Sequence, residues 1–511
     1  MKQQQKKVIT VCIVLLIVVI VVVLYPFGNR LLSKVRGYSA NAVPSTRMVP
    51  FNLPDGFIFP NTVTSHPADS IPVLVYHGIV DSDNDTDVSY TNFKNQMLAL
   101  KKAGWQTVSI EDFYAFMQGT KELPEKSFLL TFDDSRKDSY YPVDPILEAL
   151  NYKATMFVIT GRSLGGRNTS YRYHLTKAEL QEMSKSGRWD IQAHTKNGHD
   201  LYKIDKEGTK GHFYTNRLWL DSKNRLETID EFSLRIKNDL NESKNDIQEY
   251  LGIQSIAFAF PFGDFGQDSS NFPESNSILL SYSKEIFPMS FYQAWPGEGY
   301  IANYPNKNSF LIKRINVVPQ WNVEELLEQF KQSEEKKLPF SENMQIAPGW
   351  KEVWGILSIK DDRLILQADT LTNGASMFLL GTFLWKDYSF ETYLDWKKGQ
   401  TVSLLARYAD DYNYVACNFS EASVIISEHL KNTAINLAEK ENTLKLANKD
   451  IKLSIDVDGN SVRCYVNDKL IASATGLTKE LKNGGVGFNI WDPALNTSQI
   501  VIKKVKIEEI H

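Results

Sequence analysis

Between residues 71 and 335, short apolar runs alternate with amphipathic segments, and this alternation constrains the fold more than any other feature of the chain. Apolar runs such as Ser127–Phe132 have the length and composition of buried strands. The segments between them place apolar residues at helical spacing, as Phe93, Met97 and Leu100 do. Repeated strand-then-helix order is typical of a parallel sheet or barrel, so we predict an α/β fold for this region.

The pattern changes after a polar linker near residues 332–337, which indicates a second unit over residues 345–511. There, short stretches of alternating apolar and polar residues are separated by turn signals such as Asp458-Gly459. This pattern is typical of an antiparallel β-sandwich. The unit also resembles the concanavalin-like jelly rolls over residues 455–468, and the resemblance implies a carbohydrate-binding domain.

Residues 1–36 contain an almost uninterrupted apolar run, at positions 8–25, which follows three lysines. The run is about as long as a helix that crosses the hydrocarbon core of a bilayer. We therefore predict a single-pass anchor in the cell membrane, with the catalytic part outside the cytoplasm. An extended linker, rich in Pro, Ser, Thr and Asn, is expected over residues 37–70. The Ala-x-Ala triplet at positions 40–42 leaves a cleaved, secreted form as the alternative.

The net charge and the cysteine content argue against a nucleic-acid-binding protein, a disulfide-rich fold and a cysteine-bound metal. The formal net charge of −4 gives no reason to expect a nucleic acid as partner. The three cysteines are too few for a disulfide-rich fold, and the chain has no Cys-x-x-Cys pair. Cys417 and Cys464 lie on apolar strand faces, either as buried thiols or as one disulfide. Any metal site must therefore use histidine and carboxylate ligands.

Polar residues with catalytic potential directly follow four apolar runs of the predicted α/β region. The carboxyl ends of parallel strands meet at one face of a barrel, where such folds place their active sites. We therefore expect these residues to converge on one pocket. They are His77, the pair Asp133-Asp134, His194 and the triplet Pro261-Phe262-Gly263.

The adjacent carboxylates Asp133 and Asp134 either point to opposite sides of the strand end or are held apart by a bound cation, because like charges side by side raise a pKa sharply. One carboxylate can bind a metal while its neighbour acts as general base toward a water molecule. His194 and His199 can supply two neutral imidazole ligands. Two histidines and one aspartate leave open coordination positions, as a hydrolytic metal requires.

The order of these motifs resembles the polysaccharide deacetylases of carbohydrate esterase family four, which share the NodB homology domain. The resemblance covers roughly residues 71–330 and implies an irregular (β/α)7-type barrel. The expected fold class is thus an α/β deacetylase barrel followed by an all-β jelly-roll sandwich. Three motifs carry the resemblance: Thr131-Phe132-Asp133-Asp134, His194-Thr195-Lys196-Asn197-Gly198-His199 and Phe258-Ala259-Phe260-Pro261-Phe262-Gly263.

The resemblance implies a role for each motif and a divalent metal as cofactor, for which zinc is our choice. Asp190 and Arg314 are expected to contact the site residues rather than the metal or the substrate. Asp190 could equally be a solvated residue at the start of a strand. The implied roles are catalytic base for Asp133, metal ligands for Asp134, His194 and His199, and oxyanion or substrate contacts for Pro261, Phe262 and Gly263.

Departures from the common family pattern narrow the expected substrate. His194 and His199 are five positions apart rather than four, which is similar to the branch that deacetylates poly-β-1,6-N-acetylglucosamine. That branch also resembles this chain in an early His77 and in a late Arg314 where other members carry a Leu-x-His motif. His77 is therefore expected to replace the late histidine as general acid. Ala259 stands where many members have arginine, so the group that orients the base is left open.

The sequence thus predicts a cell-surface enzyme that removes acetyl groups from an N-acetylated polysaccharide, with poly-β-1,6-N-acetylglucosamine favoured. Peptidoglycan and chitin oligosaccharides are the alternative substrates. A glycan-binding pseudoenzyme is the alternative from a different class. The oligomeric state is not predicted.

The remaining histidines and tryptophans give weaker signals. Trp295 and Trp321 are expected in the core rather than as platforms for sugar rings. Histidines without a spacing that indicates chemistry are expected at the surface: His66, His174, His212, His429 and His511. The second unit has tryptophans that could line a glycan groove or fill the core: Trp350, Trp354, Trp385, Trp396 and Trp491.

Overall fold

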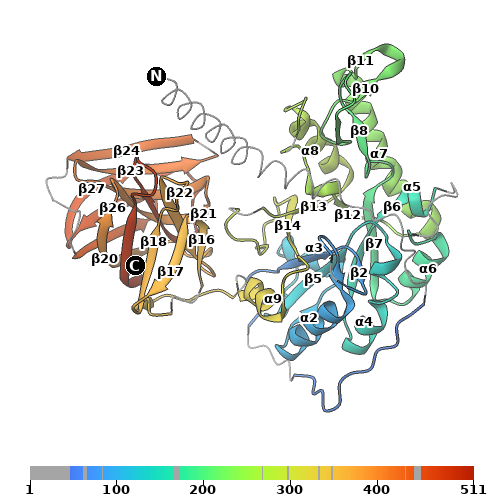
Figure 1. The fold of residues 1–511 in the computed structure, drawn as a ribbon, viewed down its shortest axis with the longest axis horizontal. Helices are drawn as coiled ribbons and strands as arrows, with labels where there is room; N and C mark the ends of the chain where they lie inside the picture. The colour runs from blue at the N-terminus through green and yellow to red at the C-terminus, as the bar shows by residue number, and fades with distance from the viewer. Residues whose placement is uncertain are drawn as a thin grey trace, which may run out of the picture.

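The computed structural model shows a barrel followed along the chain by a β-sandwich (Figure 1). The predicted membrane anchor at residues 1–36 lies outside the described residues. No helix in the described part of the chain is long and apolar enough to cross a membrane. The structure describes residues 47–510 apart from 61–65, 83, 166–172, 268, 296–297, 332–333, 347–348, 432 and 442–449.

The first unit is a closed barrel of seven parallel strands among the described residues, which confirms the predicted α/β class. The barrel closes where β1 pairs with β5, with Val73 opposite Leu129 and Tyr76 opposite Phe132. A short outer strand, β4 (Gln106–Thr107), extends β5 in parallel. Around the barrel the strand order is β1 (Val73–Tyr76), β14 (Leu311–Asn316), β13 (Met289–Gln293), β12 (Ala257–Ala259), β7 (Trp189–Thr195), β6 (Ala154–Ile159) and β5 (Ser127–Phe132).

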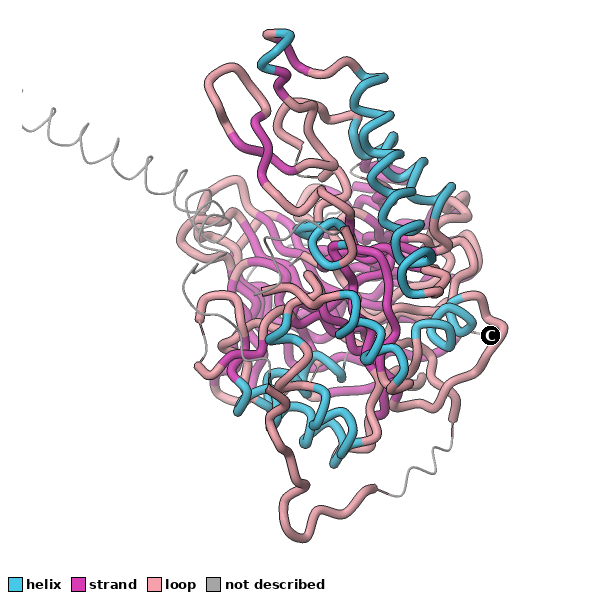
Figure 2. Tube along the Cα trace, turned by 90° about the vertical axis from the view of Figure 1, so that its right-hand side faces the viewer, coloured by secondary structure: helices cyan, strands magenta, loops and turns pink. Residues whose placement is uncertain are grey.

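Helices surround the barrel strands, as Figure 2 shows. Several begin at a polar N-cap, and α6 begins with a capping box, in which Thr176 and Glu179 each bond the other's backbone N–H. The helices of the barrel are α2 (Tyr90–Lys102), α3 (Ile110–Met117), α4 (Asp144–Leu150), α5 (Thr160–Ser163), α6 (Lys177–Lys185), α7 (Ile229–Leu251), α8 (Ser275–Ile286) and α9 (Val323–Phe330).

The described part of the expected linker is a surface arm that lies against the barrel. Residues 47–60 form no helix or strand, but their apolar side chains, including Leu53 and Phe57, pack against the barrel core. Lys102 of α2 lies over the ring of Phe57. Burial of these apolar side chains favours the docked arm over a free tether.

The second unit is an antiparallel sandwich, as predicted. The expected hairpin turn joins β25 (Asp450–Asp458) to β26 (Ser461–Val466), and Gly459 and Asn460 form it directly after Asp458. One sheet has the order β17 (Ile356–Lys360), β18 (Arg363–Gln367), β29 (Gln499–Glu509), β20 (Tyr388–Lys398), β25 (Asp450–Asp458), β26 (Ser461–Val466) and β27 (Lys469–Thr475), with β15 (Phe340–Glu342) beside β29. The other has the order β16 (Trp350–Trp354), β19 (Gly374–Leu379), β28 (Gly485–Trp491), β21 (Thr401–Asp410), β22 (Asn413–Phe419), β23 (Ser423–Leu430) and β24 (Thr433–Glu441).

Cys417 and Cys464 form a disulfide, which decides between the two states that the sequence left open. Cys417 lies on β22 and Cys464 on β26, so the bond joins the two sheets through the core of the sandwich.

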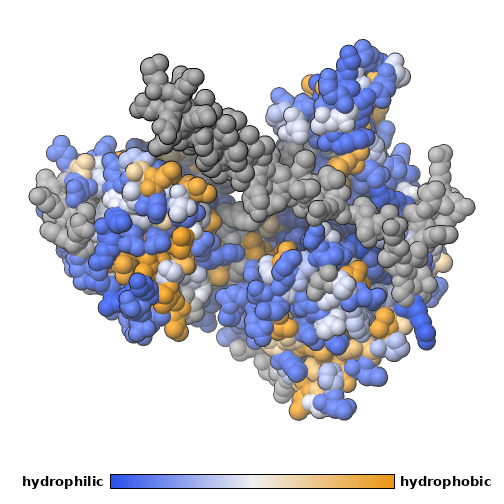
Figure 3. Space-filling view, viewed as in Figure 1, coloured by the Kyte–Doolittle hydropathy of each residue, from blue (hydrophilic) through white to orange (hydrophobic). Residues whose placement is uncertain are grey.

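The tryptophans of the sandwich mostly fill its core. Trp350, Trp385 and Trp396 are buried, whereas Trp491, at the end of β28, is 43% exposed. Figure 3 shows apolar side chains on the outer surface over β17 and β18, where Ile356 and Ile359 are exposed. Trp350, Trp385 and Trp396 therefore belong to the core and do not line a glycan groove.

The two units touch through the loop between β13 and β14. Tyr300 of that loop is buried in a cluster with Phe378 and Tyr408 of the sandwich. Its hydroxyl donates a hydrogen bond to the carbonyl oxygen of Leu379 at 2.8 Å.

Candidate metal centre and catalytic groups

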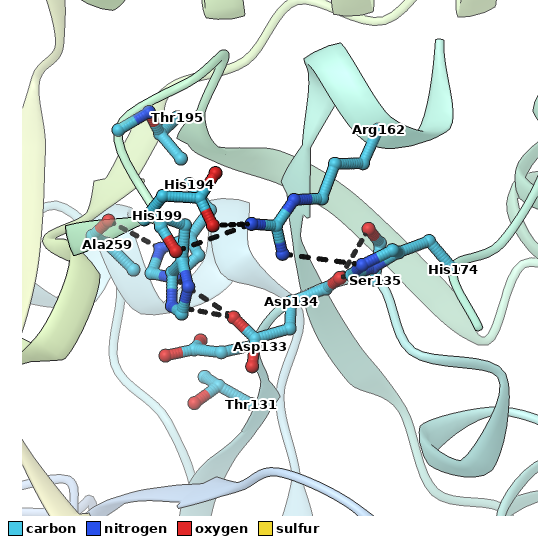
Figure 4. Close-up of polar contacts among 12 residues, drawn as sticks. Thr131, Asp133, Asp134, Ser135, Arg162, His174, His194, Thr195, His199 and Ala259 are labelled. Carbon is cyan, nitrogen blue, oxygen red and sulfur yellow. Dashed lines mark hydrogen bonds and ion pairs between the residues drawn. The ribbon is translucent and has the colours of Figure 1, made fainter. Parts of the chain in front are cut away.

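Three side chains meet at the carboxyl ends of β5 and β7, namely Asp134, His194 and His199 (Figure 4). One possible ligand atom from each lies within 4.8 Å of the others. The Oδ1 atom of Asp134 is 2.9 Å from Nε2 of His199 and 3.5 Å from Nε2 of His194. The barrel therefore brings together the three residues that the sequence proposed as metal ligands.

The charges in this cluster favour a cation between the three side chains. Burial opposes charge on both Asp134 and His199. Even so, the neighbouring imidazoles hold the pKa of Asp134 well below its usual value, and Asp134 raises the pKa of His199. His194 Nε2 is buried without a hydrogen-bond partner among the described residues, a costly state for a polar atom. Two imidazoles and a carboxylate suit a divalent metal such as zinc, so the donor set fits the implied cofactor.

His194 is held in the orientation that a metal ligand needs. Its Nδ1 atom lies 2.7 Å from the carbonyl oxygen of Ala259, at the end of β12. A proton on Nδ1 makes this bond, which leaves the lone pair of Nε2 directed at Asp134.

The loop from Thr195 to His199 is held by a buried carboxylate that the sequence did not reveal. Asp239, on the inner face of α7, accepts hydrogen bonds from the Thr195 hydroxyl at 2.6 Å and from the backbone N–H groups of Lys196 at 3.0 Å and Asn197 at 2.8 Å. These bonds order the longer loop between the two histidines. An acidic residue among the apolar positions of α7 is the signal that could have predicted this contact.

Asp133 forms a two-point ion pair with Arg314, which comes from β14 and is fully buried. Burial alone would raise the pKa of Asp133, but the guanidinium keeps that pKa below its usual value, so the carboxylate is ionised and can accept a proton. This pair also explains why Ala259 is tolerated where arginine is common, because the orienting cation arrives from another strand.

His77 lies at the end of β1, and its imidazole interacts electrostatically with both Asp133 and Asp134. Burial lowers the pKa of His77, although the two carboxylates partly oppose this effect. Its backbone is fixed on both sides. The Ser139 hydroxyl donates to the carbonyl of His77 at 2.6 Å, and Asp87 accepts from the N–H of the following glycine at 3.0 Å.

The Pro261-Phe262-Gly263 triplet forms a short 3-10 turn beside the metal centre. Phe262 has a φ of 61°, a conformation that is strained for a residue other than glycine and that clusters at functional sites. Its ring lies between two imidazoles, with centroids 4.6 Å from His199 and 4.4 Å from His212. This contact fixes the backbone that was predicted to contribute to the oxyanion hole.

The structure places Asp190 away from this cluster, which corrects the expectation that it supports a metal ligand. Asp190 lies at the start of β7, four residues and roughly 13 Å before His194. Its carboxylate accepts a hydrogen bond from the backbone N–H of Ile110 at the start of α3, at 2.8 Å. Asp190 therefore binds a helix N-terminus at the opposite end of the barrel.

Two histidines expected at the surface are buried, so that expectation was wrong for His174 and His212. The Nδ1 atom of His212 pairs with Asp264 at 2.5 Å, and its ring stacks on Phe262. Partners distant in the sequence account for their burial, and no local spacing indicates them. His511 lies outside the described residues. Trp321 is partly buried against the barrel core, as expected, and Trp295 is half-buried.

Residues 120–275 match the family described as polysaccharide deacetylase. The matched span contains Asp133, Asp134, His194, His199 and Phe262. The chain carries a polysaccharide deacetylase domain.

The deacetylase domain is also similar to curated proteins. It is 24% identical over 282 residues to a poly-beta-1,6-N-acetyl-D-glucosamine N-deacetylase of Escherichia coli (strain K12), covering 53% of this chain and 40% of that protein. It is 26% identical over 228 residues to the protein of the same name from Staphylococcus aureus (strain MSSA476), covering 45% and 67%. The chain thus spans 40% of the length of the first of these relatives.

Solved structures resemble each unit separately. A de-N-acetylase from Aggregatibacter actinomycetemcomitans aligns with the deacetylase domain at 21% identity and a TM-score of 0.44, covering 51% of this chain and all (100%) of that one. A carbohydrate binding module of Bacillus subtilis aligns at 20% identity and a TM-score of 0.28, covering 32% and 96%.

Proposed function

We propose that this chain is a metal-dependent N-deacetylase that removes acetyl groups from an N-acetylglucosamine polymer, with poly-β-1,6-N-acetylglucosamine as the favoured substrate. The observation that carries the proposal is the position of Asp133. Arg314 keeps this carboxylate ionised, and it adjoins Asp134 of the candidate metal centre. The names of both curated relatives support the choice of polymer.

The metal centre and the base have different roles in hydrolysis of the amide. Asp134, His194 and His199 would hold a divalent ion, which would supply Lewis acidity toward the acetamide carbonyl and lower the pKa of water. The carboxylate of Asp133 accepts the proton of the attacking water. Arg314 holds both oxygens of that carboxylate, so the base keeps one orientation during the transfer.

Two further groups act as the tetrahedral intermediate forms and collapses. The backbone at Phe262 contributes a donor toward the oxyanion, and its position is held by the ring contacts with His199 and His212. His77 gives a proton to the departing sugar nitrogen, because an amine anion is too poor a leaving group near neutral pH. The imidazole must be protonated for this step, and the carboxylates of Asp133 and Asp134 favour that state against the effect of burial.

The proposed location is the outer side of the cell membrane. The disulfide between Cys417 and Cys464 supports an oxidising compartment, since such bonds are rare in the cytosol. The apolar run at residues 8–25 supports a membrane anchor. The sandwich is proposed to bind the same polymer, which follows from its resemblance to carbohydrate-binding jelly rolls.

The test is release of acetate from β-1,6-linked and β-1,4-linked N-acetylglucosamine oligomers by the full-length chain, with and without chelator. Asp133→Asn should reduce release by roughly 10²- to 10⁴-fold, the range for loss of a general base. Asp112→Asn is the matched control, because it removes a carboxylate that forms an exposed ion pair with Lys121.

The outcomes separate the alternatives. Chelator-sensitive release that depends on Asp133 supports the proposal, and the preferred linkage chooses the substrate. Release from β-1,4 oligomers alone would move the substrate to chitin or peptidoglycan. Glycan binding without release from any oligomer would establish the pseudoenzyme instead.

A further inference from the structure

The metal ligand Asp134 begins an unusual turn. Asp134 and Ser135 are consecutive non-glycine residues with φ angles of 73° and 51°, in the left-handed region that such residues avoid. A turn of this kind persists only where surrounding contacts determine it. The carbonyl oxygen of Asp134 receives two of these contacts, from His174 Nδ1 at 2.8 Å and from the Ser135 hydroxyl at 2.6 Å.

The contacts of His174 determine its tautomer. Nδ1 faces a carbonyl oxygen, which can only accept, so Nδ1 carries the proton. Nε2 then presents a lone pair, and the Nη1 atom of Arg162 lies 3.4 Å from it. The imidazole thus accepts from Arg162 and donates to the backbone of Asp134.

Arg162 also reaches the second ligand. Its Nη2 atom lies 3.4 Å from the carbonyl oxygen of His199 (Figure 4). The same atom lies 2.7 Å from a carboxylate oxygen of Asp200. Arg162 belongs to the short helix α5, whose next residue, Ser163, exchanges a hydrogen bond of 2.8 Å with the hydroxyl of Ser135. Helix α5 therefore contacts the backbone of His199 directly, and it reaches the backbone of Asp134 through the side chains of His174 and Ser135.

We propose that Arg162 and His174 are positioning residues that hold the backbones of Asp134 and His199 at the separation needed to bind one cation. The inference rests on the proposed metal centre. Neither residue contacts a ligand atom, so each acts through the main chain. His194 does not depend on Arg162 and His174, because its own hydrogen bond to the carbonyl oxygen of Ala259 orients it.

The experiment measures the affinity of the full-length chain for zinc by competition with a chromophoric chelator, without substrate. Arg162→Ala and His174→Leu should each weaken zinc binding by roughly 10- to 100-fold, as expected for partners behind a metal ligand. The double variant should be little weaker than the worse single variant, because the two residues belong to one series of contacts.

Conservative variants distinguish positioning from general stability. His174→Asn keeps a donor near the place of Nδ1 and should restore zinc affinity to within about threefold of the original chain. Arg162→Lys keeps the charge but cannot reach both partners, so it should be intermediate. Arg188→Ala is the matched control, because it removes an arginine with two carboxylate contacts, at 2.8 and 3.2 Å, that do not involve the metal ligands.

The result decides between two failures. If the original chain does not bind zinc, the metal centre itself is wrong. If Arg162→Ala and His174→Leu bind zinc as well as the original chain does, the proposed positioning role of Arg162 and His174 is wrong. The proposed metal centre is then still supported. Should Arg162→Ala fail to fold, His174→Leu and Arg162→Lys are compared with Arg188→Ala instead, and equal zinc affinity of all three would contradict the proposal, since zinc affinity is measured on folded protein.

Discussion

Arg314 and Asp133 are 181 positions apart in the sequence and form a buried, two-point ion pair, with N–O distances of 2.7 and 2.8 Å. Each guanidinium nitrogen binds one carboxylate oxygen. The pair fixes both the charge and the direction of the proposed base, and its geometry suits arginine and no other residue.

The first prediction concerns Arg314→Met. Loss of the guanidinium leaves burial as the dominant effect on Asp133, so the pKa of this carboxyl should rise. Because the base must be ionised, the acid limb of the pH profile of kcat/KM should move to higher pH. The measurement is acetate release by the metal-loaded variant across the acid range.

Arg314→Lys provides the control for charge alone. It should keep the acid limb near its original position while kcat falls, since one ammonium cannot hold both oxygens. An unchanged acid limb in Arg314→Met would contradict the assignment of Asp133 as the base. Removal of one partner of a buried pair should also cost about 3–5 kcal/mol of stability, so both variants are compared at a temperature where they remain folded.

His77→Asn should discriminate between leaving groups. If His77 protonates the departing amine, the variant should lose roughly 10²- to 10⁴-fold in kcat on N-acetylated oligomers. It should lose far less on an aryl acetate ester, whose phenolate leaves without a proton. Equal losses on both substrates would indicate a structural role for His77.

Asp190→Asn should separate stability from catalysis. Burial raises the pKa of Asp190 to about 6, so the folded chain binds this proton more tightly than the unfolded chain. Stability of the original chain should therefore fall as pH rises from the ordinary value for aspartate toward 6, and remain lower above it. Asparagine resembles the protonated acid, so the variant should melt higher than the original chain above about pH 6 and equally at low pH.

Zinc affinity and acetate release are the control measurements for Asp190→Asn. Both should be unchanged, because Asp190 binds the backbone of Ile110 and not a metal ligand. A tenfold loss of zinc affinity would restore the earlier interpretation of Asp190 as a supporting residue.

Removal of the disulfide should weaken the sandwich selectively. The bond closes a chain segment with a sequence separation of 47 residues, and its loss in Cys417→Ala with Cys464→Ala should cost about 2–4 kcal/mol. In calorimetry, the transition of the sandwich should move to lower temperature while the zinc-dependent transition of the barrel stays in place. Reductant should shift the original chain in the same way and leave the double variant unchanged.

Local sequence patterns determined most of the secondary structure. Ser127–Phe132 is a strand with the predicted bounds, and Phe93, Met97 and Leu100 lie on the buried face of the helix α2 as their spacing indicated. The strand β13 (Met289–Gln293) was not predicted, because it is short, contains polar residues and follows a helix almost directly. Hydrophobic periodicity is read over a window of several residues. It therefore identifies long apolar runs and misses a short strand with polar residues such as β13.

The sequence by itself also predicted the barrel, the sandwich and the three residues of the candidate metal centre. The residues of the candidate centre follow apolar runs, and the ends of these runs must meet in a parallel barrel. The resemblance named Arg314 as a supporting residue, but only the tertiary structure decided its partner and the other groups that support the site. Arg314 reaches Asp133, Asp239 holds the loop before His199, and His174 meets Asp134. Such contacts depend on barrel closure and helix packing, which place residues in contact regardless of their separation along the chain.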